Sequence, residues 1–266
     1  MTMSGTNALL NIFASLVDPG KNVLLPEPYF PLYGPDVGLW GGEPRFYECL
    51  FENEFVPTIE HLESLVDDDT VAILYNFPSN PTGATITPEQ RDELLAFAQR
   101  HDLWLVTDEV YDRIVFDSEH VSFVGSDDDR VILINSFSKT YAMTGWRLGF
   151  SVWPDQLLEY ATRLCVNNHS CVNAPTQYAG IAALKGPQDV VNSMLNEFQQ
   201  RRKFIVDALN KLPGVYCQEP GGAFYVFPNI VKTGLSSQKA QDDFLEIAGV
   251  ATIAVSYTHL TLPTKA

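Results

Sequence analysis

A lysine preceded by two hydroxyls and followed by an arginine is the part of this chain whose residue types best suit chemistry. The group consists of the apolar run 131–134, Ser136, Ser138, Lys139 and Arg147. A lysine at the end of a buried strand is costly to keep charged, but its neutral amine can form a Schiff base with an aldehyde. Hydroxyls and a guanidinium suit a phosphate group. Together these residues predict a cofactor that carries both an aldehyde and a phosphate, namely pyridoxal 5'-phosphate.

Taken alone, a Ser-x-Ser-Lys pattern is more often a surface lysine on a serine-rich turn. Two further positions reverse that preference. Asp108 follows the apolar run 103–106, and Asn80 follows the run 71–75. Helical segments separate these runs, and the alternation predicts a parallel sheet whose strands end at one edge, where ligands bind. We therefore expect Asn80, Asp108 and Lys139 to meet in one pocket.

The pattern of apolar and helix-capping residues predicts the remaining elements. Residues 87–90, Thr-Pro-Glu-Gln, form a capping box with proline at the first helical position, and they open a helix that we expect to reach residue 101. Further helices are expected at 7–17, 59–66, 154–166 and 187–212. Strands are expected at 23–25, 45–50, 71–75, 103–106, 131–134, 148–153, 215–217 and 223–227.

Five motifs, in this order, are similar to those of one enzyme family. They are SGTNAL at 4–9, NPTG at 80–83, DEVY at 108–111, SFSKTYAMTGWRLG at 136–149 and GGAFYVFP at 221–228. With these motifs the chain resembles the pyridoxal-phosphate enzymes of fold type I, in the class I/II aminotransferase family. The resemblance extends from residue 4 to about residue 254.

The resemblance implies an α/β fold with two domains. Residues 1–200 correspond to a three-layer α/β/α large domain with a mostly parallel sheet, which binds the cofactor and includes the start of an interdomain helix. Residues 201–254 correspond to part of a smaller α+β domain. Residues 255–266 do not resemble the family and look like a translated sequencing adaptor, so we expect this tail to be non-native.

Two other features lead us to expect a chain that is truncated at both ends. The chain begins at the phosphate-binding motif, without the N-terminal arm and first strands of the family. The family also binds the substrate carboxylate with an arginine near its C-terminus, whereas the last arginine here is Arg202. A carboxylate without this bidentate partner loses binding energy and orientation. We therefore expect the 266-residue chain to be inactive by itself and its parent to be active.

The family's roles at the reacting end of the cofactor fall on four residues of this chain. The resemblance implies that Lys139 forms the Schiff base with the cofactor and then moves a proton during the reaction. Asp108 would pair with the pyridine nitrogen and keep it protonated. Tyr111 and Asn80 would hydrogen-bond the phenolic oxygen. Taken singly, Asp108 also suits a helix cap and Asn80 a turn before proline.

The resemblance also implies a phosphate site and a stacking residue. Gly5 lets the backbone approach closely, and the helix that begins there turns its positive end toward the phosphate. The phosphate would be held by Ser4, Gly5, Thr6, Ser136, Ser138 and Arg147. Phe30 would lie against the face of the ring, with Tyr29 as the weaker candidate. As a lone residue, Phe30 also suits the core.

Composition and charge exclude several other classes of protein. A chain of 266 residues with 45% hydrophobic residues can bury a substantial core and is expected to be soluble and globular. A net charge of −16 disfavours nucleic acid and anionic membrane as partners. The sequence contains no apolar stretch of transmembrane length and no basic-then-apolar leader.

Cysteine and glycine spacing gives no sign of a metal or a dinucleotide. The cysteines, at positions 49, 165, 171 and 217, show no C-x-x-C spacing, and the histidines do not cluster. We therefore expect neither a metal site nor a disulfide framework, and a reducing cytoplasm fits best. No G-x-G-x-x-G motif follows a strand, so a dinucleotide-dependent enzyme is not indicated.

The first hypothesis for function is an aminotransferase that moves an amino group between an L-amino acid and a 2-oxo acid, as a homodimer. A C–S β-lyase of the same fold is the second. The shared motifs do not separate these two reactions, because the choice depends on groups around the substrate. A non-catalytic, aminotransferase-like regulatory domain is the third. The strongly acidic charge disfavours the DNA-binding segment that such a regulator carries.

Overall fold

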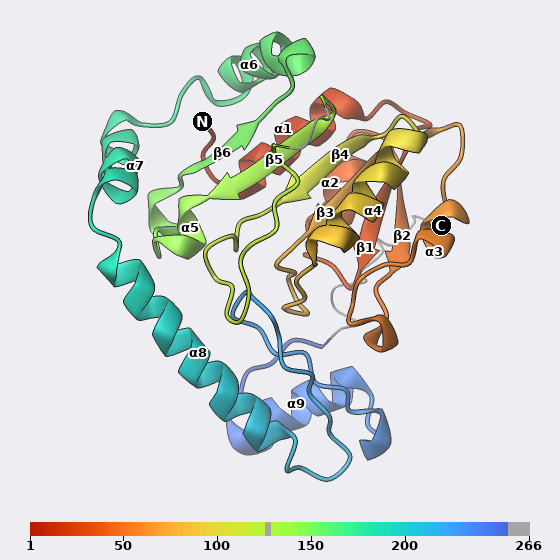
Figure 1. Cartoon of the computed structure of the whole chain (residues 1–266), viewed down its shortest axis with the longest axis vertical. Coiled ribbons are helices and arrows are strands. Elements are labelled where there is room, and N and C mark those ends of the chain that lie inside the picture. Colours follow the sequence, from red (N-terminus) through yellow and green to blue (C-terminus); the bar gives the residue numbers. More distant parts are fainter. Residues whose placement is uncertain (126–128, 255–266) are drawn as a thin grey trace.

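The computed structural model describes residues 1–125 and 129–254, so the tail that we expect to be non-native lies outside the described residues. Within those ranges six strands form one sheet, in the order β2-β1-β3-β4-β5-β6 (Figure 1). The strands are β1 Asn22–Glu27, β2 Glu43–Glu48, β3 Thr70–Asn76, β4 Trp104–Asp108, β5 Val131–Ser136 and β6 Gly149–Val152. All neighbouring pairs are parallel except β5 and β6, which are antiparallel. The prediction of a mostly parallel sheet is confirmed.

Helices cover both faces of the sheet and make a three-layer large domain. Helices α1 (Gly5–Leu16) and α2 (Tyr33–Leu39) lie on one face, and α3 (Ile59–Glu63) and α4 (Pro88–Arg100) lie on the other (Figure 1). Consecutive strand residues point to opposite faces. In β3, Ile73 therefore packs in one apolar core and Leu74 in the other. Burial on both faces explains why the central strands are nearly continuous apolar runs.

The helix that follows the NPTG motif begins and ends where the sequence predicted. The Thr87 hydroxyl accepts from the Gln90 amide N–H at 3.2 Å, and the Gln90 side chain accepts from the Thr87 N–H at 2.9 Å. This capping box opens α4 at Pro88. Leu94 and Phe97 are buried against the sheet. The helix covers the face opposite α1.

The first residues of the chain are fixed beside the last strand. Thr2 and Gly149 exchange two backbone hydrogen bonds, at 2.9 and 3.0 Å. A Cβ atom on Gly149 would lie 2.5 Å from the carbonyl carbon of Ser4, so only glycine permits this close approach. The pairing sets the start of α1 next to the end of β5.

A long helix leads from the large domain to a smaller helical unit (Figure 1). After β6 come α6 (Asp155–His169), α7 (Ala174–Lys185) and α8 (Asp189–Leu209), and α9 (Ser237–Ala248) lies in the smaller unit. Short helices are found at α5 (Phe137–Thr140), η1 (Phe51–Asn53), η2 (Thr144–Trp146) and η3 (Val231–Thr233). Helix α7 was not expected from the sequence. None of the helices in the described ranges is long and apolar enough to span a membrane.

The two strands expected in the smaller unit are wrong. Residues 215–217 and 223–227 form no strand in the described part of the chain, and the contacts there are the isolated bridges Tyr216–Asn229 and Val115–Gly222. A strand forms a ladder of hydrogen bonds with a neighbouring strand. The segment that begins at Ala223 instead has one backbone hydrogen bond to the loop at Ile114, from the Ala223 N–H to the Ile114 carbonyl. The alternating apolar pattern is present, but the pairing is not.

Candidate active site

A cavity of about 200 Å³ lies at the carboxyl ends of β3, β4 and β5. All the residues predicted for the site line it: Ser4, Gly5, Thr6, Phe30, Asn80, Asp108, Tyr111, Ser136, Ser138, Lys139 and Arg147. Asp108 and Ser136 are the last residues of β4 and β5, which are paired and parallel. The strand ends therefore bring together residues that are far apart in the sequence.

Lys139 lies on the short helix α5, directly after β5. Ser136 caps this helix, since its hydroxyl accepts from the Ser138 N–H at 3.1 Å. Burial lowers the pKa of the half-buried Lys139 amine, and the negative charge of Asp108 opposes this shift. The amine nitrogen also lies 5.2 Å from the centre of the Phe224 ring. Burial favours the neutral, nucleophilic amine, whereas the Phe224 ring, like Asp108, favours the ammonium form.

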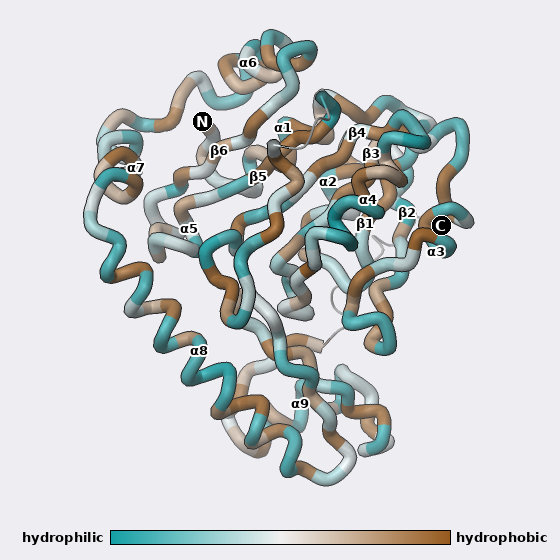
Figure 2. Tube along the Cα trace, in the orientation of Figure 1, coloured by the Kyte–Doolittle hydropathy of each residue, from teal (hydrophilic) through white to brown (hydrophobic). Residues whose placement is uncertain are grey.

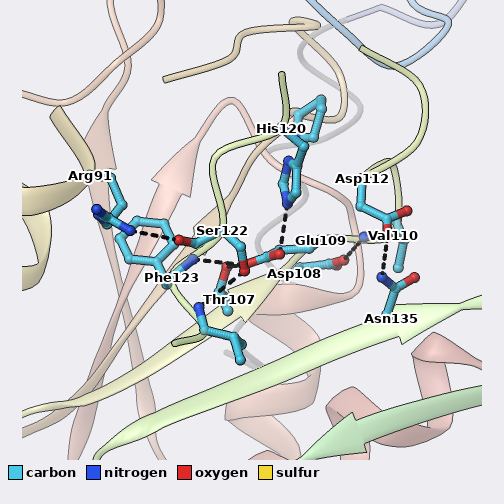
Figure 3. Close-up of polar contacts among 12 residues, drawn as sticks. Arg91, Thr107, Asp108, Glu109, Val110, Asp112, His120, Ser122, Phe123 and Asn135 are labelled. Atoms are coloured by element: carbon cyan, nitrogen blue, oxygen red, sulfur yellow. Dashed lines mark hydrogen bonds and ion pairs between the residues drawn. The ribbon is translucent and has the colours of Figure 1, made fainter. Parts of the chain in front are cut away.

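A carboxylate on the loop after β4 holds the helix that carries Lys139. One oxygen of Asp112 accepts from the Asn135 side-chain amide at 3.0 Å, and the other accepts from the Thr140 hydroxyl at 3.2 Å. Figure 3 shows the contact between Asn135 and Asp112. Asn135 and Thr140, which lie on either side of Lys139 in the sequence, are thus both held by the loop that follows Asp108. Asp112 was not predicted as a site residue.

Asp108 is a buried carboxylate, 8% exposed, with two hydrogen-bond donors. The Tyr33 hydroxyl donates to it at 2.8 Å, and the Val110 N–H donates at 3.3 Å (Figure 3 shows the second). Burial raises the pKa of Asp108 to about 6, and the hydrogen bonds and the nearby Lys139 oppose this rise. The group can therefore hold a proton or a negative charge near neutral pH.

An asparagine at the end of β3 ties the NPTG loop to the Asp108 strand. The Asn76 side chain donates to the backbone carbonyl of Asp108 at 2.9 Å and accepts from the Asn80 N–H at 2.8 Å. Asn76 also lines the cavity. Asn76 was not predicted as a site residue, because the NPTG motif indicates only Asn80.

Two tyrosines from distant segments meet at the cavity. The hydroxyls of Tyr111 and Tyr225 lie 2.7 Å apart and share a hydrogen bond. Burial raises the pKa of Tyr111, while a hydrogen bond from the Asn80 side chain lowers it. Tyr225 belongs to the GGAFYVFP motif and was not predicted as a site residue. It brings a segment from beyond α8 into the site.

Groups that bind anions surround the other part of the cavity. The Ser4 hydroxyl caps α1 by accepting from the Asn7 N–H at 3.2 Å. The helix that starts at Gly5 has 12 residues, and its first N–H groups and positive end suit an anion. The exposed Arg147 donates to the Thr144 carbonyl at 2.8 Å and forms no ion pair within the described ranges.

The donor set of the cavity fits pyridoxal phosphate. Arg147, the serine hydroxyls and the α1 terminus suit the phosphate group, the Lys139 amine suits the aldehyde, and the buried Asp108 suits the ring nitrogen. Phe30 lines the cavity, whereas Tyr29 stacks on Phe46 with ring centres 4.7 Å apart. The roles of these residues remain predictions.

A comparison with known proteins identifies the family. Residues 1–265 match the family model described as aminotransferase class I and II. The chain belongs to this family. It is 38% identical over 244 residues to an aspartate aminotransferase of Pyrococcus horikoshii, an alignment that covers 91% of this chain and 62% of that protein.

Other class I and II aminotransferases give the same result. An aromatic-amino-acid aminotransferase 2 of Thermococcus litoralis is 38% identical over 259 residues, covering 95% of this chain and 66% of that protein. The crystal structure of an aromatic aminotransferase from Pyrococcus horikoshii superposes with a TM-score of 0.94 at 37% identity, covering 97% of this chain and 70% of the other. The chain thus spans 62% to 66% of the length of these two curated relatives.

Behind the site of this aminotransferase-family chain, a second buried carboxylate holds a loop against β4. Glu109 is 3% exposed and accepts from the Thr107 and Ser122 hydroxyls, both at 3.0 Å, and from the Phe123 N–H at 3.1 Å. His120 lies 2.7 Å from its other oxygen. Figure 3 shows these contacts converging on Glu109. No local motif predicts this network, because the partners of Glu109 lie up to 14 residues away in the sequence.

Glu109→Ala is expected to destabilise the fold strongly. The change leaves several buried donors without an acceptor, so we expect the free energy of unfolding to fall by about 3–5 kcal/mol. Urea denaturation measures this loss. The control is Glu159→Ala, which removes an exposed ion pair with Arg163 and should change stability by less than about 1 kcal/mol. Similar losses in the two variants would contradict a stabilising role for the Glu109 network.

Proposed function

We propose that the protein is a pyridoxal-phosphate-dependent aminotransferase that moves an amino group between an L-amino acid and a 2-oxo acid. Lys139 is the residue that holds the cofactor as a Schiff base. The observation that carries the proposal is the meeting of a lysine amine, a buried carboxylate and an anion-binding set in one cavity. Membership of a family whose relatives are named as aspartate and aromatic aminotransferases supports it.

The chemistry of the cofactor is that of an electron sink, because its protonated ring accepts the electron pair released when a bond at the substrate α-carbon breaks. Lys139 supplies the base. Its lowered pKa leaves more of the amine neutral, so its nitrogen can take the proton from the α-carbon and return it elsewhere. The contacts of Asp112 with Asn135 and Thr140 hold this amine in place.

The other residues bind and orient. Asp108 would pair with the ring nitrogen and, when ionised, keep a proton there. Tyr111 and Asn80 would hydrogen-bond the phenolic oxygen. The phosphate would be held by Arg147, the serine hydroxyls and the α1 terminus.

Half-reactions with single amino acids test the proposal. The full-length protein, loaded with pyridoxal phosphate, is mixed with aspartate, alanine, phenylalanine, methionine or a cysteine conjugate, and the products are quantified. An aminotransferase converts the cofactor to pyridoxamine phosphate and releases one 2-oxo acid per site. A C–S β-lyase instead releases ammonia, pyruvate and a thiol from a cysteine conjugate, with the cofactor unchanged. Failure of every amino acid to give pyridoxamine phosphate would contradict the proposal.

We also propose that the protein is a homodimer. Apolar side chains exposed on α6, α7 and α8 support this: Leu158, Tyr160, Val166, Tyr178, Leu184 and Val190. Figure 2 shows hydrophobic positions recurring along these helices. Exposed apolar residues spread over three helices indicate a surface that a partner covers. Sedimentation of the full-length protein as a monomer at micromolar concentration would contradict this.

A cytoplasmic location is part of the same proposal. The free cysteines Cys49, Cys165, Cys171 and Cys217 support it, because thiols persist in a reducing compartment. A fluorescent fusion in the source cell tests the location, and a signal outside the cytoplasm would contradict it.

Arg147→Ala is expected to weaken binding of the phosphate group specifically. Losing a charge-assisted hydrogen bond of about 1.5–3 kcal/mol should raise the Kd for pyridoxal phosphate roughly 10- to 100-fold. The Kd for pyridoxal, which has no phosphate, should stay nearly constant. Fluorescence titration of the cofactor-free protein measures both values, with the exposed Arg163→Ala as the control. Equal losses for the two ligands would contradict a phosphate-binding role.

A further inference from the structure

Tyr33 is a buried phenol that contacts the central carboxylate of the cavity. It is 1% exposed, lines the cavity, and donates to Asp108 at 2.8 Å. Burial and the charge of Asp108 raise the pKa of Tyr33 well above its ordinary value, so the phenol keeps its proton and is the donor. Its backbone is anchored by a hydrogen bond from its N–H to the Phe30 carbonyl at 3.1 Å.

Few groups compensate the buried charge of Asp108. Lys139 faces it with a positive charge from α5, and Glu109 adds a negative charge from the same strand end. Tyr111 and Tyr225 lie close enough for the charge of Asp108 to act on them. Of its two hydrogen-bond donors, Tyr33 is the closer and the more buried. The ionised form of Asp108 thus depends strongly on this one phenol.

We propose that Tyr33 is a positioning residue that keeps Asp108 ionised and oriented toward the ring nitrogen of the cofactor. This inference rests on the proposed function, in which Asp108 meets that nitrogen. Tyr33 does not react. It stabilises the carboxylate form that the ring requires, and it fixes the orientation of the carboxylate through one oxygen.

Tyr47 provides a matched control. It is also 1% exposed, and its hydroxyl donates at 2.7 Å to the backbone carbonyl of Leu74. It does not line the cavity. Tyr33→Phe and Tyr47→Phe therefore delete the same atom from equally buried sites, but only the first change removes a donor from Asp108. An ordinary structural role predicts the same behaviour for both variants.

Binding of two ligands by the cofactor-free, full-length protein separates these roles. The ligands are pyridoxal phosphate and its analogue with carbon in place of the ring nitrogen. We expect Tyr33→Phe to raise the Kd for pyridoxal phosphate about 10-fold at pH 5, where a rise of about one unit in the pKa of Asp108 lowers its ionised fraction about tenfold. The Kd for the analogue should stay nearly unchanged. Tyr47→Phe should alter the two Kd values by the same factor. Equal losses for both ligands in Tyr33→Phe would overturn the proposal.

The pH dependence of pyridoxal phosphate binding gives a second readout. Removing a donor to a carboxylate raises its pKa, so the acidic limb of the binding curve should move up by about one pH unit in Tyr33→Phe and stay in place in Tyr47→Phe. If Tyr33→Phe does not fold, 3-fluorotyrosine at position 33 replaces it. This stronger donor of similar size should move the limb to lower pH. An unmoved limb in the variant that folds would overturn the proposal.

Failure of the proposed function has a different signature. In that case the unmodified protein forms no reducible adduct with pyridoxal phosphate at Lys139, whatever stands at position 33. Failure of the Tyr33 proposal alone leaves that adduct intact, with the two ligands and the two tyrosine variants behaving alike.

Discussion

Lys139→Ala is expected to abolish the covalent link to pyridoxal phosphate and to lower amino-group transfer by at least about 10²–10⁴-fold. The loss has two causes, because the variant lacks both the amine that forms the Schiff base and the base that moves the proton. The visible absorbance of the bound cofactor and single-turnover rates measure the two effects. Binding directed by Arg147 and Ser136 through the phosphate should survive in weaker form.

The control for Lys139→Ala is Lys185→Ala, at the exposed end of α7. This change should leave absorbance and rate unaltered. Added methylamine, which can replace the missing amine, should restore part of the rate in Lys139→Ala. A variant with alanine at position 139 that keeps the full rate would show that another group performs the proton transfer.

Asp108→Asn is expected to separate catalysis from cofactor attachment. Asparagine is nearly the same size but carries no charge, so the ring nitrogen loses the partner that keeps it protonated. We expect turnover to fall about 10²–10³-fold, as when one preorganised electrostatic group is removed, while the Schiff base with Lys139 still forms. Turnover within a few-fold of the unmodified protein would contradict the role of Asp108.

The same substitution should stabilise the cofactor-free protein at neutral pH. The pKa of Asp108 rises from its ordinary 3.8 to about 6 in the fold, so above pH 6 folding keeps a buried charge that the unfolded chain holds in water. Asparagine removes this cost, and we expect a gain of roughly 3 kcal/mol in the free energy of unfolding at pH 7.5. The gain should shrink between pH 6 and pH 4, where Asp108 takes up its proton. A gain that does not change with pH would contradict the shift.

The polar residues at the strand ends could be predicted from the sequence, because each of them directly follows an apolar run that forms a strand. Parallel strands end at the same edge of a sheet, so the sequence alone predicts that Asn80, Asp108 and Lys139 lie close together. Tyr33 was missed for a physical reason. An aromatic residue at the start of a helix looks like a core residue, and its contact with Asp108 joins positions 75 residues apart.

The wrong strand predictions lie where pairing depends on distant parts of the chain. The segment 223–227 has the alternation of a strand, but no neighbouring strand lies along it in the described part of the chain. The antiparallel direction of β6 follows from its pairing with β5, which periodicity alone does not reveal. Helix α7 did have a local signal, since the Asn173 side chain caps it by accepting from the Thr176 N–H at 3.0 Å. Residues 173–175, Asn-Ala-Pro, are typical of a helix start.

Peptide mapping of the reduced adduct tests the central claim most directly. The full-length protein is loaded with pyridoxal phosphate and treated with borohydride, which converts a Schiff base into a stable amine. Mass spectrometry then locates the modified lysine. We predict one modification per chain, on the peptide that contains Lys139. Modification of another lysine, such as Lys21 or Lys185, or no modification at all, would contradict the account.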